Sequence, residues 1–115
     1  MNLLQIAFLF FAAIAAGGLL MALMIVFKAK VPSFFPPAHG IGGLAAVALL
    51  FFANLQLGDA TPENAWWALG VFTAGLIGGL LFFRVLFKKA APLWAIAGHG
   101  SVAAVGLYLL YGAAF

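Results

Sequence analysis

The chain has 115 residues, of which 68% are hydrophobic and 6% are charged, and five basic and two acidic residues give a formal net charge of +3. A soluble domain carries about 25% charged residues, so the composition excludes an ordinary soluble domain and indicates an integral membrane protein. The chain has no cysteine, which excludes a disulfide framework, a thiolate zinc site, an iron–sulfur cluster and a thiol nucleophile.

Four apolar runs follow one another along the chain, and each is long enough for the roughly 20 residues that a membrane-spanning helix needs. A proline-rich segment separates the first two runs, a polar loop over 58–64 separates the next two, and Pro92 opens the last. The sequence therefore predicts one all-α transmembrane domain, residues 1–115, built as a four-helix bundle. The predicted helices cover about 3–27, 36–57, 64–88 and 92–113.

The charged residues divide between the predicted connections by sign. All five basic residues lie at the first and third connections, whereas Asp59 and Glu63 lie in the second. Positive connections stay on the cytoplasmic side of a membrane. We therefore expect a bacterial inner-membrane protein with loops 28–37 and 88–92 in the cytoplasm and both termini in the periplasm. The positive charge is explained by this topology, and no basic patch suggests nucleic acid as a partner.

An internal repeat is visible when the sequence is compared with itself at an offset of 60 residues. The matched pairs are Lys28 with Lys88, Pro32 with Pro92, His39-Gly40 with His99-Gly100, and Gly18 with Gly78. This pattern predicts two tandem hairpins, about 1–57 and 61–115. Each hairpin crosses twice, so the copies share one orientation and are related by an axis along the membrane normal.

The two histidines of the chain are equivalents in this repeat, and a two-fold axis would bring His39 and His99 face to face at one depth near the cytoplasmic side. We expect Pro36-Pro37 to delay the second helix, so that residues 32–36 must turn inward for the depths to match. Four and seven residues after each histidine the residues are small, which leaves space beside each ring or serves close helix packing. These small residues are Gly43, Ala46, Ala103 and Gly106.

Ionisable residues inside a membrane are costly and usually functional. Two imidazoles from facing helices can be the axial ligands of a haem iron, and a b-type haem needs no cysteine attachment. Arg84 and Lys88, one turn apart on the predicted third helix, are the expected partners of the propionates. Lys28, Lys30 and Lys89 are expected to extend to the interface as topology residues.

These residues resemble the small membrane b-type cytochromes of the cytochrome b561 and dehydrogenase-anchor kind. The resemblance covers the four-helix architecture and the two His-Gly positions, His39-Gly40 and His99-Gly100. A b561-type protein has four ligand histidines for two haems, whereas this chain has enough for one. The resemblance therefore implies one haem b near the cytoplasmic side, exchanging electrons with a quinone or with a partner subunit.

Other functions remain open. Histidine can ligate chlorophyll, and Ala95-x-x-x-His99 has the spacing of antenna helices. A cofactor-free accessory or assembly subunit of a larger membrane complex, a homo-oligomer or a small solute carrier also fits the composition. Two imidazoles alone are too few for a closed zinc site, and Ser101 has no positioned base or carboxylate for hydrolysis. We do not expect a self-contained enzyme, although the chain could be the electron-transfer component of an oxidoreductase.

Overall fold

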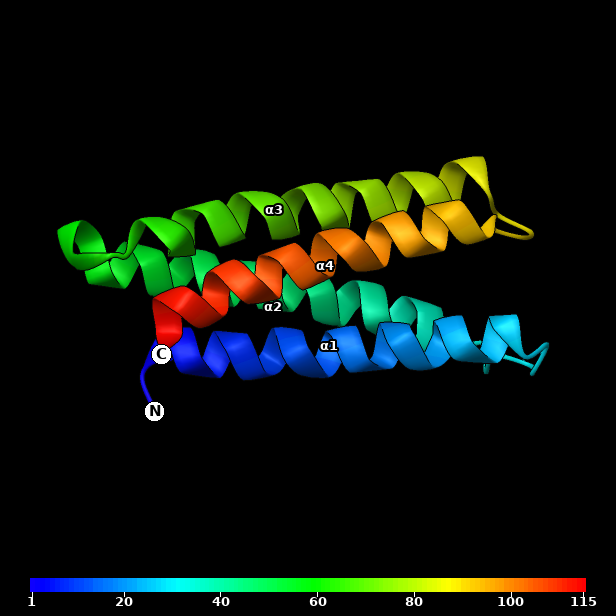
Figure 1. The fold of residues 1–115 in the computed structure, drawn as a ribbon, viewed down its shortest axis with the longest axis horizontal. Coiled ribbons are helices and arrows are strands. Elements are labelled where there is room, and N and C mark those ends of the chain that lie inside the picture. The colour runs from blue at the N-terminus through cyan, green and yellow to red at the C-terminus, as the bar shows by residue number, and fades with distance from the viewer.

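Four long helices run side by side in the computed structural model, which covers residues 1–115 (Figure 1). They are α1 (Leu3–Val26), α2 (Phe35–Leu57), α3 (Glu63–Leu80) and α4 (Leu93–Ala114). A short 3-10 helix, η1 (Gly58–Ala60), follows α2, and a π-helix, η2 (Leu81–Leu86), continues α3. The all-α prediction and the four-helix bundle are confirmed.

The helices form a four-cornered bundle of 46 × 24 × 19 Å. Helix α1 packs against α2 and α4, and α3 packs against the same two neighbours. Helices α2 and α4 therefore occupy opposite corners, as do α1 and α3. Both termini and the α2–α3 connection lie at one end, whereas the other two connections lie at the opposite end (Figure 1).

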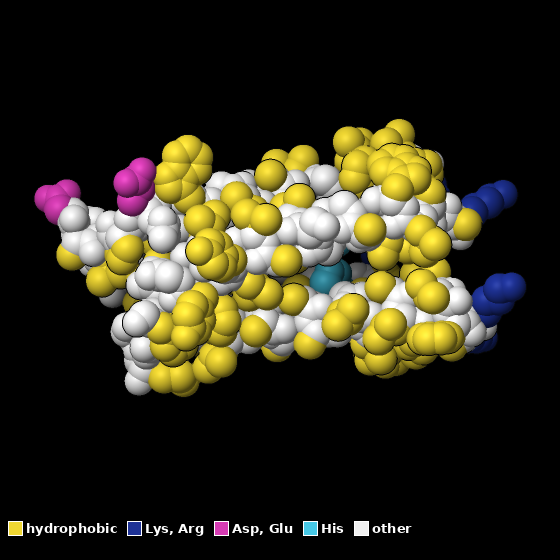
Figure 2. All heavy atoms as spheres, viewed as in Figure 1, with side chains coloured by type: hydrophobic (Ala, Val, Ile, Leu, Met, Phe, Trp, Pro, Cys, Tyr) yellow, Lys and Arg dark blue, Asp and Glu magenta, His cyan; other side chains and the backbone are white.

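All four helices are long and apolar enough to cross a membrane: Leu3–Val26, Phe35–Ala60, Glu63–Leu86 and Leu93–Ala114. Only 14 of the 115 residues are buried, so most large apolar side chains lie on the outside of the bundle. Figure 2 shows the charges gathered at the two ends, acidic at one and basic at the other, with an apolar surface between them. This distribution is compatible with an integral membrane protein.

The first two helices begin in different ways. The Asn2 side chain accepts a hydrogen bond from the Gln5 backbone N–H at 2.9 Å, and the Gln5 side chain accepts one from the Asn2 N–H at 3.2 Å. This reciprocal pair is a capping box. Helix α2 begins at Phe35, with Pro36 and Pro37 in its first turn. This start lies within one residue of the predicted one and two residues later than the repeat equivalent of Leu93, where α4 begins. A first turn needs no N–H donor and suits the fixed φ of proline.

The third helix changes character before its expected end at residue 88. Regular α-helix stops at Leu80, the π-helix continues to Leu86, and the Phe87 N–H donates to the Phe82 carbonyl at 2.7 Å. Lys88 and Lys89 follow in a bend outside the helix.

The core is built from residues spaced three or four apart, which lie on one face of each helix. These residues are Leu4, Ala7 and Phe11 on α1, Ala65, Ala68 and Phe72 on α3, Ala46, Leu50 and Ala53 on α2, and Gly106, Leu110 and Ala114 on α4. Side chains of α1 and α3 thus meet those of α2 and α4 along the bundle axis.

Two levels of this core combine a large pair on one diagonal with a small pair on the other. Phe11 and Phe72 stack with ring centres 3.6 Å apart and planes 7° apart. Helix α4 has Gly106 at this level, where an added Cβ would lie 2.6 Å from Phe72 Cε1. At the next level toward the termini, α4 has the buried Leu110, four residues after Gly106. Helix α3 has the buried Ala68 there, four residues before Phe72. Large residues on one diagonal thus pack against small residues on the other.

Candidate functional site

The two histidines lie together on one diagonal of the bundle. His39 is on α2 and His99 is on α4, with ring centres 6.1 Å apart and planes 69° apart. Both residues are half-buried, and histidine atoms are visible between the helices in Figure 2. The structure thus brings together two residues that are 60 positions apart in the sequence.

Glycines occupy the other diagonal at the histidine level. A Cβ added to Gly18 of α1 would lie 2.8 Å from His39 Cε1, and one added to Gly79 of α3 would lie 2.8 Å from His99 Cε1. Real Cβ atoms essentially never approach another heavy atom so closely. Each imidazole therefore contacts the bare backbone of a helix that supplies no histidine, and only glycine at these two positions allows it.

Sequence comparison at a fixed offset of 60 missed half of this arrangement. It pairs Gly18 with Gly78, but an added Cβ on Gly78 would meet nothing within 4 Å, and the glycine against His99 is Gly79. The glycine precedes the histidine by 21 residues in the first hairpin and by 20 in the second, since 39 − 18 = 21 and 99 − 79 = 20. Allowing one gap in the comparison would have found Gly79, together with the match of Phe11 to Phe72.

The surroundings of the two imidazoles differ. The ring of His99 makes an edge contact with Phe83 of η2 at 5.4 Å between ring centres. His39 Nδ1 is buried and makes no hydrogen bond of standard geometry, although the backbone of Ile14 lies within reach of the imidazole.

The four small residues expected to leave room beside the rings have unequal environments. Ala46 is fully buried in the core cluster, and Gly106 lies against the ring of Phe72. The space expected at Gly106 is therefore filled, because the stacked phenylalanines need small residues opposite them. Gly43 is more open: an added Cβ would reach only Leu76 Cδ1, at 3.8 Å. Ala103 is half-buried.

The two cations expected to hold propionates are separated by the change in helix type. Arg84 lies within the π-helix, whereas Lys88 lies beyond its end, and both side chains are exposed. The expected one-turn spacing on a common helix is therefore wrong, because the helix ends at Leu86. Lys28, Lys30 and Lys89 are exposed at the same end of the molecule.

No other set of side chains forms a comparable centre. No group of three or more His, Cys, Asp or Glu residues is close enough to hold a metal ion. Asn54 is fully buried between α2 and α3, where its Nδ2 donates to the Ala65 carbonyl at 3.1 Å and its Oδ1 has no partner. Ser101 donates to the Ala97 carbonyl of its own helix. The histidine pair with its two glycines is thus the candidate site.

A comparison of the chain with protein-family models, with curated proteins and with solved structures finds no match.

Proposed function

We propose that the chain is a membrane b-type cytochrome-like protein or subunit in which His39 and His99 are the axial ligands of one haem. The observation that carries the proposal is the arrangement of four residues at one level of the bundle. The imidazole centres of His39 on α2 and His99 on α4 are 6.1 Å apart, and the rings lie against Gly18 of α1 and Gly79 of α3. When bound, a haem supplies one-electron chemistry through its iron.

The spacing of the imidazoles agrees with that needed to ligate one metal ion. A metal lies about 2 Å from an imidazole nitrogen, which is itself about 1 Å from the ring centre, so two ligating rings have centres about 6 Å apart. The 6.1 Å separation of His39 and His99 fits this value.

The ligand count favours a haem over a bare ion. A bare ion would require more ligands than two imidazoles, whereas the porphyrin nitrogens of a haem leave only two axial positions for the protein. Gly18 and Gly79 let the two imidazoles lie against α1 and α3, and a Cβ added to Gly43, one turn beyond His39, would contact only Leu76 Cδ1, at 3.8 Å.

The basic end of the bundle suits the propionates of the haem. Arg84 follows Gly79 by five residues, about 7 Å along a helix, and a guanidinium pairs well with a carboxylate. Both acidic residues are at the far end, so no carboxylate of the protein competes for these cations. Arg84 is therefore the propionate partner that we propose, with Lys88 as a second, more distant cation.

The proposed setting is a bacterial inner membrane, with both termini in the periplasm and the basic connections in the cytoplasm. The support for it is the separation of charge between the two ends of the bundle. We also propose that the chain is a tandem duplication of a hairpin. Buried residues recur at an offset of 61 on the first helix of each hairpin, as Phe11 and Phe72, and of 60 on the second, as Leu50 and Leu110.

One observation favours a second candidate, a cofactor-free subunit of a larger membrane complex. The histidine level has the same composition as the core levels beside it, with a large pair on one diagonal and a small pair on the other. The imidazoles could then be large packing residues of the bundle. The two candidates differ in whether the site takes up haem.

Haem titration of the purified protein in detergent tests the proposal. Addition of haemin should give a low-spin Soret band that saturates at one haem per chain, and His39→Ala and His99→Ala should each remove it. Ser101→Ala, on an exposed face of α4, is the matched control and should bind haem normally. Titration without a saturable low-spin spectrum, in protein that remains helical, would favour the cofactor-free subunit.

A further inference from the structure

The basic end of the bundle carries more positive charge than the protein itself neutralises. Arg84, Lys88 and Lys89 are exposed there, and the side-chain hydrogen bonds of the structure involve none of them. Asp59 and Glu63 are at the opposite end of the bundle, whose length is 46 Å. The positive charge at this end of the molecule is therefore unpaired within the protein, and an anion from outside can neutralise it.

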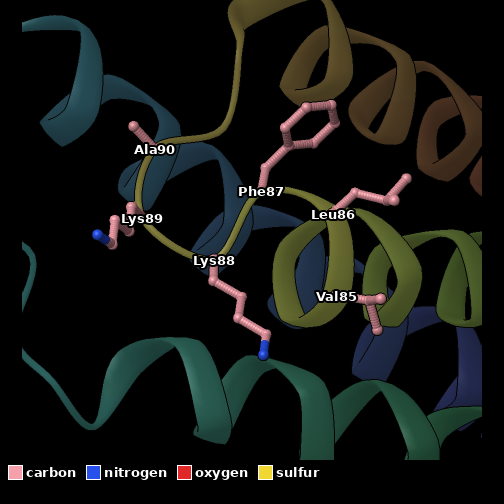
Figure 3. Close-up of a pocket in the computed structure, with 6 residues that line it drawn as sticks. All are labelled: Val85, Leu86, Phe87, Lys88, Lys89 and Ala90. Atoms are coloured by element: carbon pink, nitrogen blue, oxygen red, sulfur yellow. The ribbon is translucent and has the colours of Figure 1, made fainter.

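A surface pocket of about 320 Å³ lies at the α3–α4 connection, among these cations. Figure 3 shows its lining: the side chains of Lys88 and Lys89 extend from the loop in different directions, and apolar side chains border the rest. The lining residues are Val85, Leu86, Phe87, Lys88, Lys89 and Ala90. Charged and apolar groups thus adjoin within one small depression.

The early end of the regular helix builds this pocket. The π-helix ends at Leu86, and Phe87 turns toward α4, where its ring contacts Trp94 at 5.7 Å between centres. Lys88 and Lys89 then leave the helix axis together. The first connection has a similar Phe-Lys-x-Lys sequence but a different turn, in which Lys28 has a positive φ of 58°. The two connections therefore provide an internal comparison.

We propose that this pocket binds an anionic phospholipid, with its phosphate at Lys88 and Lys89 and its acyl chains along Val85 and Leu86. The inference rests on the membrane placement in the proposed function, but not on haem. Val85 and Leu86 are 61% and 56% exposed, so acyl chains can reach them. No carboxylate lies nearby to pair with the amine of a zwitterionic headgroup, and basic pockets at this depth bind anionic headgroups.

Trp94 provides a reporter for this lipid, because its ring contacts Phe87 and is 63% exposed. Trp66→Phe and Trp67→Phe would leave Trp94 as the single tryptophan. The protein is reconstituted in phosphatidylcholine vesicles that contain a minor fraction of phosphatidylglycerol, with bromine on the acyl chains of one lipid or the other. At equal bromine content, brominated phosphatidylglycerol should quench Trp94 several-fold more strongly than brominated phosphatidylcholine.

Two double variants distinguish binding of the lipid at this pocket from general electrostatic attraction of anionic lipids to the basic end of the protein. Lys88→Gln with Lys89→Gln should abolish the preference for phosphatidylglycerol, because a lysine near the surface contributes about 1 kcal/mol to the attraction of an anionic lipid. Lys28→Gln with Lys30→Gln, at the other basic connection, should leave it almost unchanged. Equal quenching by the two lipids, or equal losses in both double variants, would overturn the lipid site. Absence of quenching by either lipid would contradict the membrane placement itself, whereas haem binding is read separately from the Soret band.

Discussion

Adjacent glycines have different roles in α1 and α3. Gly18 and Gly79 contact the imidazoles, whereas Gly17 and Gly78 have open space where a Cβ would be. The sequence alone cannot distinguish the members of each pair, because both fit the same apolar run. The difference arises from helix rotation: successive residues point about 100° apart, and only one of the two glycines faces the bundle axis.

Substitution of the inward glycines should move the imidazoles. Gly18→Ala and Gly79→Ala place a methyl group 2.8 Å from a ring carbon, so each should lower the free energy of unfolding by about 1–3 kcal/mol and weaken haem binding. Gly17→Ala and Gly78→Ala are the controls and should be neutral or stabilising. Unfolding in mixed micelles, followed by circular dichroism, measures the difference. Equal effects within each pair would contradict the assigned rotation of the helices.

The histidine pair could be predicted from its repeat spacing, but the space around it could not. Ala46 and Gly106 are small in the sequence for a reason that depends on another helix: they accommodate the stacked rings of Phe11 and Phe72. A small residue can face solvent, a cofactor or a neighbouring aromatic ring, and its type alone does not show which of these it faces. Only the packing of four helices together identifies its partner.

At the level of elements, α4 offers a direct test of this packing. Gly106→Ala would bring a methyl group to 2.6 Å from the ring of Phe72, which is held in place by its stack on Phe11. We expect a loss of stability toward the upper part of the range of about 1–3 kcal/mol for overpacked cores, larger than for Gly18→Ala. Gly100→Ala, on the same helix with nothing within 4 Å, is the control for changes in helix propensity. A neutral Gly106→Ala would show that the ring stack is absent in solution.

The number of helices was predictable because each span needs a long apolar run, and their ends were predictable only in part. The capping of α1 and the proline start of α4 follow local rules, whereas the π-helix over Leu81–Leu86 has no clear signal in the sequence. Its consequence is large, since it separates Arg84 from Lys88 and shapes the pocket at the α3–α4 connection. Phe83 of this π-helix contacts His99, so the segment also borders the histidine pair.

At the scale of the whole molecule, the absence of cysteine makes the proposed topology easy to test. Single substitutions Lys30→Cys, Lys89→Cys and Asp59→Cys introduce one thiol each into a chain that has none. In intact cells with a permeable outer membrane, a membrane-impermeant maleimide should label Asp59→Cys only. Lys30→Cys and Lys89→Cys should react after the inner membrane is opened. Labelling of a lysine position in intact cells would contradict the proposed orientation.

The absorption spectrum of the chain purified from haem-replete cells tests whether His39 and His99 bind haem. We expect a red protein with a low-spin Soret band that shifts on reduction with dithionite, present at one haem per chain and dependent on both His39 and His99. A helical, stable protein that is colourless after such expression, and stays so when haemin is added, would contradict the assignment of the histidine pair as haem ligands.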